Sequence, residues 1–137
     1  MTRAARYAYL VLAWLVVVAI VAQVFFIGLG LFAGSENIET HRTFGYIVHL
    51  LPIPLLLAAA LSRAGRRHWQ WALALAAVVF IVPILVLMKD AAPVVAALHP
   101  VGAVVAFWLA VVVAQNSLAA VRQADVLGPE ARGSTVA

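Results

Sequence analysis

Four long apolar stretches, separated by short polar segments, dominate the chain. They run roughly over residues 7–32, 38–61, 69–88 and 93–121. Each is long enough to cross a bilayer, because a spanning helix needs about 20 mostly apolar residues. The connections between them are short, and short connections make neighbouring helices antiparallel. The pattern therefore predicts an all-α membrane protein: a single domain over residues 1–137, folded as an up-down bundle of four transmembrane helices.

Details within the stretches refine this picture. The first apolar run is far longer than the roughly 7–15 residues of a signal peptide, so we expect it to be a retained helix. Pro52, Pro54 and Pro83 fall inside stretches and should kink or widen those helices. The segment after the fourth stretch, residues 122–137, contains Gly128, Pro129 and Gly133, and we expect it to be a loose C-terminal tail.

Composition agrees with a membrane fold. Hydrophobic residues make up 66% of the chain and charged residues only 10%, whereas a soluble domain carries about 25% charged residues. A soluble globular protein is therefore excluded, and so is a disordered chain, which needs the opposite composition. The chain has no cysteine, which excludes disulfides, iron–sulfur clusters and thiolate metal sites.

Arginine and lysine are unevenly divided between the two sides of the predicted bundle. Seven fall on the side of the termini: Arg3, Arg6, Arg63, Arg66, Arg67, Arg122 and Arg132. Only Arg42 and Lys89 fall on the other side. Because positively charged segments stay in the cytoplasm, we expect both termini to be cytoplasmic and the membrane to be a bacterial plasma (inner) membrane. The net charge of +4 is then a membrane signal, and we expect no nucleic-acid partner.

The two halves of the chain resemble each other. In each half a long apolar stretch ends in a short turn with acidic residues, and the next stretch soon reaches a histidine. A glycine follows that histidine: Gly45 comes four residues after His41, and Gly102 comes three residues after His99. The pattern predicts that the bundle consists of two similar helical hairpins, one of the repeat arrangements found in membrane proteins.

The two histidines are expected at the same depth. Ser35 is a suitable N-cap for the second helix and Pro93 a suitable first residue for the fourth. His41 and His99 then lie about 9 Å inside their helices, near the outer face. Two neutral imidazoles are the usual axial ligands of a b-type haem, and a bundle core is where facing helices build such sites. We therefore predict one haem b, with His41 and His99 as the metal ligands.

Four more residues belong to this predicted cofactor site. Arg42 could pair with a haem propionate, although extension to the membrane interface is its more ordinary role. Gly45 and Gly102 would let a flat group or a neighbouring helix approach the backbone. His49 lies about 12 Å deeper than His41 and about 80° around the helix. It could replace His41 as ligand, contact a cofactor edge or bind a quinone, but the second hairpin has no equivalent histidine.

Two other interpretations of the histidines stay open. A copper or zinc ion would need three or four ligands, which His41, His99 and Glu39 could supply in part. Alternatively, the protein is a cofactor-free accessory or structural subunit of a larger membrane complex, and the histidines form interhelical hydrogen bonds. His68 falls in the basic segment and is expected to be solvated, so at most one haem is predicted.

Three segments resemble a known group of proteins: residues 23–30 (QVFFIGLG), 41–46 (HRTFGY) and 97–101 (ALHPV). They look like a family of small, uncharacterised four-helix bacterial membrane proteins, a domain of unknown function. Residues 36–42 (ENIETHR) also resemble the start of the second helix in haem A synthase. There a Glu precedes a haem-ligating His-Arg pair, and each four-helix half supplies a histidine from its second and fourth helices. This resemblance implies His41 and His99 as ligands. A looser likeness is to small b-type cytochromes with four helices.

These observations lead to a functional expectation. The protein should hold one b-type haem near the outer face and serve electron transfer or haem handling. One haem on one side cannot carry an electron across a core of roughly 30 Å. Besides the lipid bilayer, we therefore expect a quinone or a respiratory-chain protein as partner. Whether the chain is itself a membrane oxidoreductase stays open.

Overall fold

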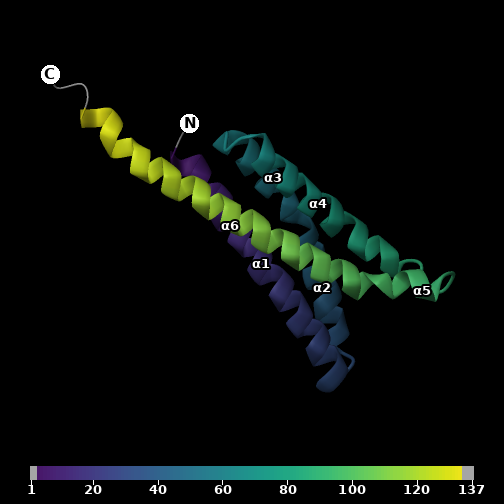
Figure 1. Cartoon of the computed structure of the whole chain (residues 1–137). Coiled ribbons are helices and arrows are strands. Elements are labelled where there is room, and N and C mark those ends of the chain that lie inside the picture. The colour runs from purple at the N-terminus through teal and green to yellow at the C-terminus, as the bar shows by residue number, and fades with distance from the viewer. Residues whose placement is uncertain (1–2, 134–137) are drawn as a thin grey trace.

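The computed structural model describes residues 3–133, which form helices and turns without strands (Figure 1). The helices are α1 (Arg3–Phe32), α2 (Asn37–Leu50), α3 (Pro52–Ser62), α4 (Arg66–Val86), α5 (Pro93–Ala96) and α6 (Leu98–Gly133). Four segments of the described chain are long and apolar enough to span a membrane: residues 3–32, 37–62, 66–86 and 93–123. The predicted all-α fold with four membrane-spanning helices is confirmed.

Two of the four spans are interrupted. The second span breaks at Leu51, directly before Pro52, where the Leu51 N–H bonds to the Val48 carbonyl at 3.3 Å in a tighter turn. Proline causes such breaks because it has no N–H and its ring clashes with the preceding turn. The fourth span breaks at Ala97, between α5 and α6. Pro83, in contrast, stays inside α4.

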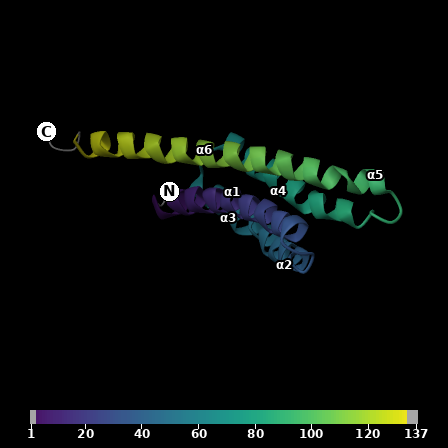
Figure 2. The ribbon, with the colours of Figure 1, turned by 90° about the horizontal axis from the view of Figure 1, so that it is seen from below.

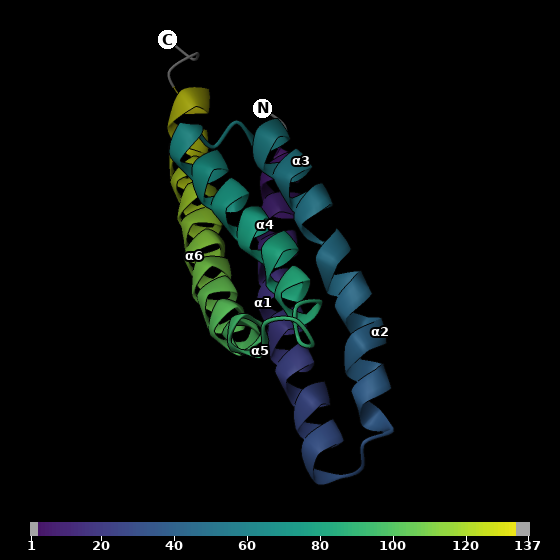
Figure 3. The ribbon, with the colours of Figure 1, turned by 90° about the vertical axis from the view of Figure 1, so that its right-hand side faces the viewer.

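The helices form two hairpins, as the internal similarity predicts. One hairpin is α1 with α2 and α3, and the other is α4 with α5 and α6. Seen from below, the hairpins lie in two layers (Figure 2). They pack through α1 against α6 and α3 against α4, whereas over the described range neither α4 nor α6 packs closely along α2. The hairpins accordingly diverge toward their loops (Figure 1), and the α1–α2 turn reaches farther than α5 (Figure 3).

The two ends of the bundle differ chemically. We call the end that carries Arg63, Arg66 and Arg67 the basic end; α1 begins there and α6 runs out past it (Figure 1). We call the opposite end, which carries the α1–α2 and α4–α5 turns, the histidine end. Three acidic residues, Glu36, Glu39 and Asp90, fall in or beside those two turns, and the other two, Asp125 and Glu130, fall in the last part of α6.

The apolar core lies mainly between the basic end and the middle of the bundle. It consists largely of small side chains that let helices approach closely, as is usual where helices pack inside a membrane. The most buried members include Tyr9, Ala13, Val16, Leu55, Ala72, Leu75, Ala110, Val113 and Ala114. Large apolar side chains on the outside, such as Val18, Phe25 and Val104, are more than half exposed. Such a surface suits contact with lipid rather than with water.

Two boundaries differ from the prediction. The segment predicted as a loose tail begins at residue 122, but α6 continues to Gly133. Residues 122–127 are mostly tolerated in helices, so the helix propagates past its last apolar turn. Residues 134–137 of that predicted tail lie outside the described part of the chain. The third span begins at Arg66 rather than near Trp69, because Gly65, with φ of +105°, ends the turn just before it.

Candidate functional site

The imidazoles of His41 and His99 lie next to each other where the two hairpins diverge. His41 is in the first turns of α2, and His99 is the second residue of α6. Their ring centroids are 6.5 Å apart and their planes make an angle of 80°. Both side chains are partly buried. The structure therefore brings together two histidines that are 58 residues apart in the sequence.

Each histidine forms a hydrogen bond to the preceding helix of its own hairpin. His41 Nδ1 lies 3.0 Å from the Gln23 carbonyl oxygen of α1. His99 Nδ1 lies 3.0 Å from the Val82 carbonyl oxygen of α4. A carbonyl oxygen can only accept, so Nδ1 carries the proton in both rings. In the neutral form of each ring, the free lone pair then lies on Nε2.

The two glycines of the predicted site serve these contacts. A Cβ at Gly45 would lie 2.8 Å from Gln23 Nε2, and a Cβ at Gly102 would lie 2.6 Å from Val82 Cγ2. Each glycine therefore faces the residue whose carbonyl receives the histidine of the same hairpin. The sequence leaves open whether these glycines admit a flat group or a neighbouring helix. In the structure each glycine admits a neighbouring helix.

These contacts repeat between the hairpins. In each hairpin a histidine Nδ1 bonds to a carbonyl 17 or 18 residues earlier, and a glycine one turn later packs against that same residue. The internal similarity thus extends to individual hydrogen bonds. Gln23 and Val82 take part through their backbones, which explains why side-chain chemistry alone did not identify them.

Arg42 and Glu39 form an ion pair at the rim of this site. Arg42 Nη1 lies 2.9 Å from Glu39 Oε2, and the two side chains are 63% and 66% exposed. An exposed pair of this kind contributes about 0–1 kcal/mol, so Arg42 could exchange its partner readily. Over the described residues no three histidine, cysteine or acidic side chains gather as a metal site would require. The three-ligand metal interpretation with Glu39 therefore lacks support.

His49 lies apart from the pair. Its Nδ1 bonds to the Gly45 carbonyl of its own helix at 3.0 Å. Its ring packs edge-on against Phe80 of α4, with centroids 6.1 Å apart. His49 therefore faces an aromatic ring where His41 faces a second histidine.

Gln23 has one further feature. Its side-chain oxygen Oε1 is buried and has no hydrogen-bond partner among the described residues. Buried polar atoms are nearly always paired, so an unpaired one is unusual.

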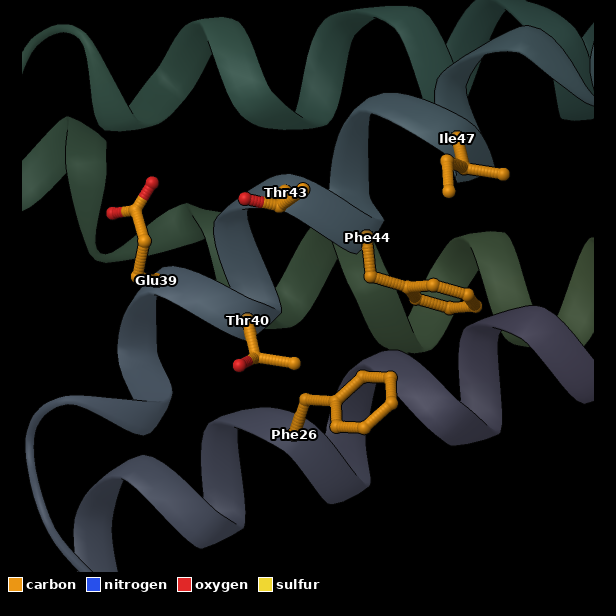
Figure 4. Close-up of a pocket in the computed structure, with 6 residues that line it drawn as sticks. All are labelled: Phe26, Glu39, Thr40, Thr43, Phe44 and Ile47. Carbon is orange, nitrogen blue, oxygen red and sulfur yellow. The ribbon is translucent and has the colours of Figure 1, made fainter.

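A groove of about 370 Å³ runs beside His41 on the surface of α1 and α2. Its lining residues are shown in Figure 4: Phe26, Glu39, Thr40, Thr43, Phe44 and Ile47. Phe26 and Phe44 pack edge-to-face with centroids 5.1 Å apart. Thr40, which lines this groove, precedes His41 in the chain.

His68 is not in a solvated loop as the sequence suggests. Because α4 begins at Arg66, His68 lies in its first turn and is partly buried. Its ring packs edge-on against Tyr9 with centroids 6.4 Å apart, and the Tyr9 hydroxyl donates to its carbonyl at 3.5 Å. His68 Nδ1 is buried without a partner among the residues described. It lines a small polar pocket with Asn116 and Gln123, which the sequence did not reveal.

Comparisons with known proteins give a family without an assigned activity. Residues 23–92 match a family of unknown function, DUF6220. This match covers half of the chain and includes His41, His49 and the Val82 acceptor, but not His99. No curated protein and no solved structure matches the chain.

Proposed function

The chain belongs to the DUF6220 family, whose description assigns no activity, and we propose from the geometry of its site that it binds one b-type haem between His41 and His99. The observation that carries this proposal is the matched pair of Nδ1–H bonds to the carbonyls of Gln23 and Val82. Histidines that bind metals almost always donate their other ring N–H to a carbonyl or carboxylate, which fixes ring orientation and increases the basicity of the ligating nitrogen.

The spacing of the rings supports the same proposal. His41 and His99 would hold one metal ion together only if their rings lay close to each other, since a metal–nitrogen bond is about 2.0 Å long. The distance between His41 and His99 is 6.5 Å.

Haem would supply one-electron transfer. The protein's own part is to orient the two imidazoles, to provide Arg42 at the rim as a cation for a carboxylate, and to exclude bulk water with apolar helices. The role is electron transfer or haem handling in a bacterial plasma membrane, with both termini in the cytoplasm and the histidine end outside. The seven-to-two distribution of arginine and lysine supports this orientation.

A lipid quinone is the partner that the surface beside His41 suits best. The groove of Figure 4 is open and largely apolar, and it carries an aromatic pair and threonine hydroxyls. If a quinol donates there, one quinol reduces two protein molecules and releases two protons. We expect Ile47→Trp, which fills the groove, to slow reduction by an added quinol while the haem absorption stays unchanged.

The structure also favours one rival. The same two Nδ1–H bonds would stabilise a cofactor-free accessory subunit by tying the helices of each hairpin together. The two functions differ in what they require of Nε2, which only the haem proposal uses.

The deciding experiment is a reduced-minus-oxidised absorption spectrum of the purified protein, produced with sufficient haem. We expect an α-band and a Soret band typical of b-type haem, lost in both His41→Ala and His99→Ala. His49→Ala is the matched control and should keep the bands. A colourless wild-type protein would overturn the haem proposal, and bands that vanish in His49→Ala but survive in His41→Ala would move the ligand to His49.

A further inference from the structure

A second polar pocket lies at the basic end, far from the histidine pair. It has a volume of about 170 Å³ and is lined by Arg67, His68, Asn116, Ala119, Ala120 and Gln123. The lining comes from the start of α4 and the later part of α6. Fourteen residues separate His68 from Val82 on α4, so the two sites are about 21 Å apart along that helix.

The polar side chains around this pocket have no partners in the structure. Asn116, Gln123 and Arg67 form no side-chain hydrogen bond or ion pair within the described part of the chain. His68 Nδ1 is buried and also unpaired. Polar groups in an apolar bundle are costly unless they are satisfied. Of these groups only His68 Nδ1 is buried, whereas Arg67 and Gln123 are exposed. One buried, unpaired nitrogen beside a guanidinium and two amides that line the same pocket favours a polar occupant.

The charged residues around the pocket indicate that its ligand is negatively charged. Arg67 lines it, and Arg63, Arg66 and Arg122 lie at the same end of the bundle. The carboxylates whose side chains the structure describes, Glu36, Glu39 and Asp90, all lie at the histidine end. The first turn of α4 also lacks a side-chain cap, so its N–H groups add to the positive potential. On this side of the chain, seven arginines outnumber the two acidic residues of the sequence, Asp125 and Glu130.

We propose that this pocket binds the anionic phosphate group of a ligand at the basic end of the bundle. Arg67 would pair with the phosphate oxygens, and the amides of Asn116 and Gln123 would donate to them. The volume is far above the roughly 10–15 Å³ that one water requires, so a phosphate group can be accommodated. Two sources present this chemistry at a membrane surface: an anionic phospholipid headgroup and a soluble phosphate ester. The proposal does not depend on haem at the histidine end.

Native mass spectrometry of the detergent-solubilised protein can test the lipid source. The probes are phosphatidylglycerol, which is anionic, and phosphatidylcholine, which is zwitterionic. We expect phosphatidylglycerol to be retained preferentially. Arg67→Gln should weaken its binding about tenfold or more, because a hydrogen bond to a charged group contributes about 1.5–3 kcal/mol. Asn116→Leu should weaken it without changing the net charge.

Two neighbouring substitutions are matched controls. Arg66→Gln removes the same charge from the adjacent residue, which does not line the pocket. Gln115→Leu removes an amide next to Asn116, also outside the pocket. Both controls should bind phosphatidylglycerol as the wild type does. Circular dichroism and size-exclusion chromatography of all four variants would show that the bundle is intact. If Arg67→Gln or Asn116→Leu fails to fold, His68→Phe is the alternative variant of a lining residue, because it retains an aromatic ring beside Tyr9.

Titration calorimetry with glycerol 3-phosphate separates the two sources. Saturable binding that Arg67→Gln abolishes would support the phosphate site and identify a soluble ester as ligand. Preferential phosphatidylglycerol binding without ester binding would support the site and identify a lipid headgroup. Equal losses in Arg66→Gln and Arg67→Gln, equal retention of the two lipids, or no binding of any probe would overturn the proposal.

Discussion

Gly102 of α6 lies so close to Val82 of α4 that a Cβ on the glycine would stand 2.6 Å from Val82 Cγ2. The carbonyl of the same valine accepts the bond from His99 Nδ1. The close approach and the hydrogen bond are therefore parts of one contact: the helices must approach closely for the imidazole to reach the backbone of α4.

Replacing this glycine should destabilise the bundle. Gly102→Ala forces the new methyl group against a β-branched side chain with little rotamer freedom. Overpacking of this kind costs about 1–3 kcal/mol. We expect the free energy of unfolding in detergent to fall by that amount, as measured by denaturant titration followed by circular dichroism.

Two other glycines provide the comparison. At Gly45 the new methyl would meet the end of the flexible Gln23 side chain, and at Gly28 it would meet nothing within 4 Å. Gly45→Ala should therefore cost less than Gly102→Ala. Gly28→Ala should be neutral or stabilise by up to about 1 kcal/mol, because alanine favours helices. Equal losses at the three positions would contradict this packing argument.

Asparagine substitutions can separate the two nitrogens of each histidine. The amide of asparagine can place a donor near the position of Nδ1 but has nothing at the position of Nε2. His41→Asn and His99→Asn should retain most of the wild-type stability, whereas His41→Leu and His99→Leu should each lose about 1 kcal/mol with the hydrogen bond. Thermal unfolding of the four variants measures this. Equal stability of the Asn and Leu variants would show that the bonds to Gln23 and Val82 contribute little.

The long-range pairing at the histidine end was accessible from the sequence for a simple reason. His41 and His99 each follow a turn by a similar number of residues, and antiparallel hairpins bring such positions to the same end of a bundle. The sequence could not predict which carbonyls accept these bonds, because every residue has a carbonyl. Only the way in which the helices cross brings the carbonyls of Gln23 and Val82 to the histidines. That crossing depends on packing between small residues, which hydrophobic periodicity does not encode.

Two buried serines should differ in their contribution to stability. Ser62 and Ser117 are both fully buried, and each donates to a carbonyl three residues earlier, at 2.8 Å to Ala59 and 2.7 Å to Ala114. Ser62 Oγ also accepts from the Ala64 N–H at 3.3 Å, just after α3 ends. Ser62→Ala leaves that N–H unpaired and should cost about 1–2 kcal/mol.

The Ser117→Ala variant is the control for this prediction. The Ala114 carbonyl remains within the ladder of α6, so losing the hydroxyl should cost only a few tenths of a kcal/mol. Denaturant titrations of both variants would measure the difference in their free energies of unfolding, with the same dependence on denaturant concentration assumed for both. A larger loss in Ser117→Ala would mean that closure of the α3–α4 turn is unimportant.

The proposed orientation can be tested with single cysteines, since the natural chain contains none. Ser35→Cys places a thiol in the α1–α2 turn, and Ala64→Cys places one in the α3–α4 turn. A membrane-impermeant maleimide should label the first in intact cells and the second only after the membrane is permeabilised. The opposite labelling pattern would invert the topology.

The basic end shows where sequence reasoning reached its limit. The number of arginines and lysines on each side predicts an orientation, and that prediction needs no knowledge of helix boundaries. The pocket beside His68 depends on α4 beginning at Arg66, and helix boundaries are the least certain part of a sequence-based prediction. The helix begins three residues earlier than predicted, at Arg66 instead of Trp69. His68 is therefore in a helix, against Tyr9 and across the pocket from Asn116.

The interruption at Leu51 divides the second span into α2 and α3, which we expect to differ in their stability against local unfolding. α3 is packed between α1 and α4, whereas α2 rests mainly on α1. Local unfolding follows such differences in packing, so backbone amides of α2 should exchange with solvent deuterium faster than those of α3. The molecule can then open at one end in a sub-global step while its core stays folded. If a haem binds between His41 and His99 as proposed, such an opening would let it enter sideways from the bilayer after the remainder of the bundle has assembled.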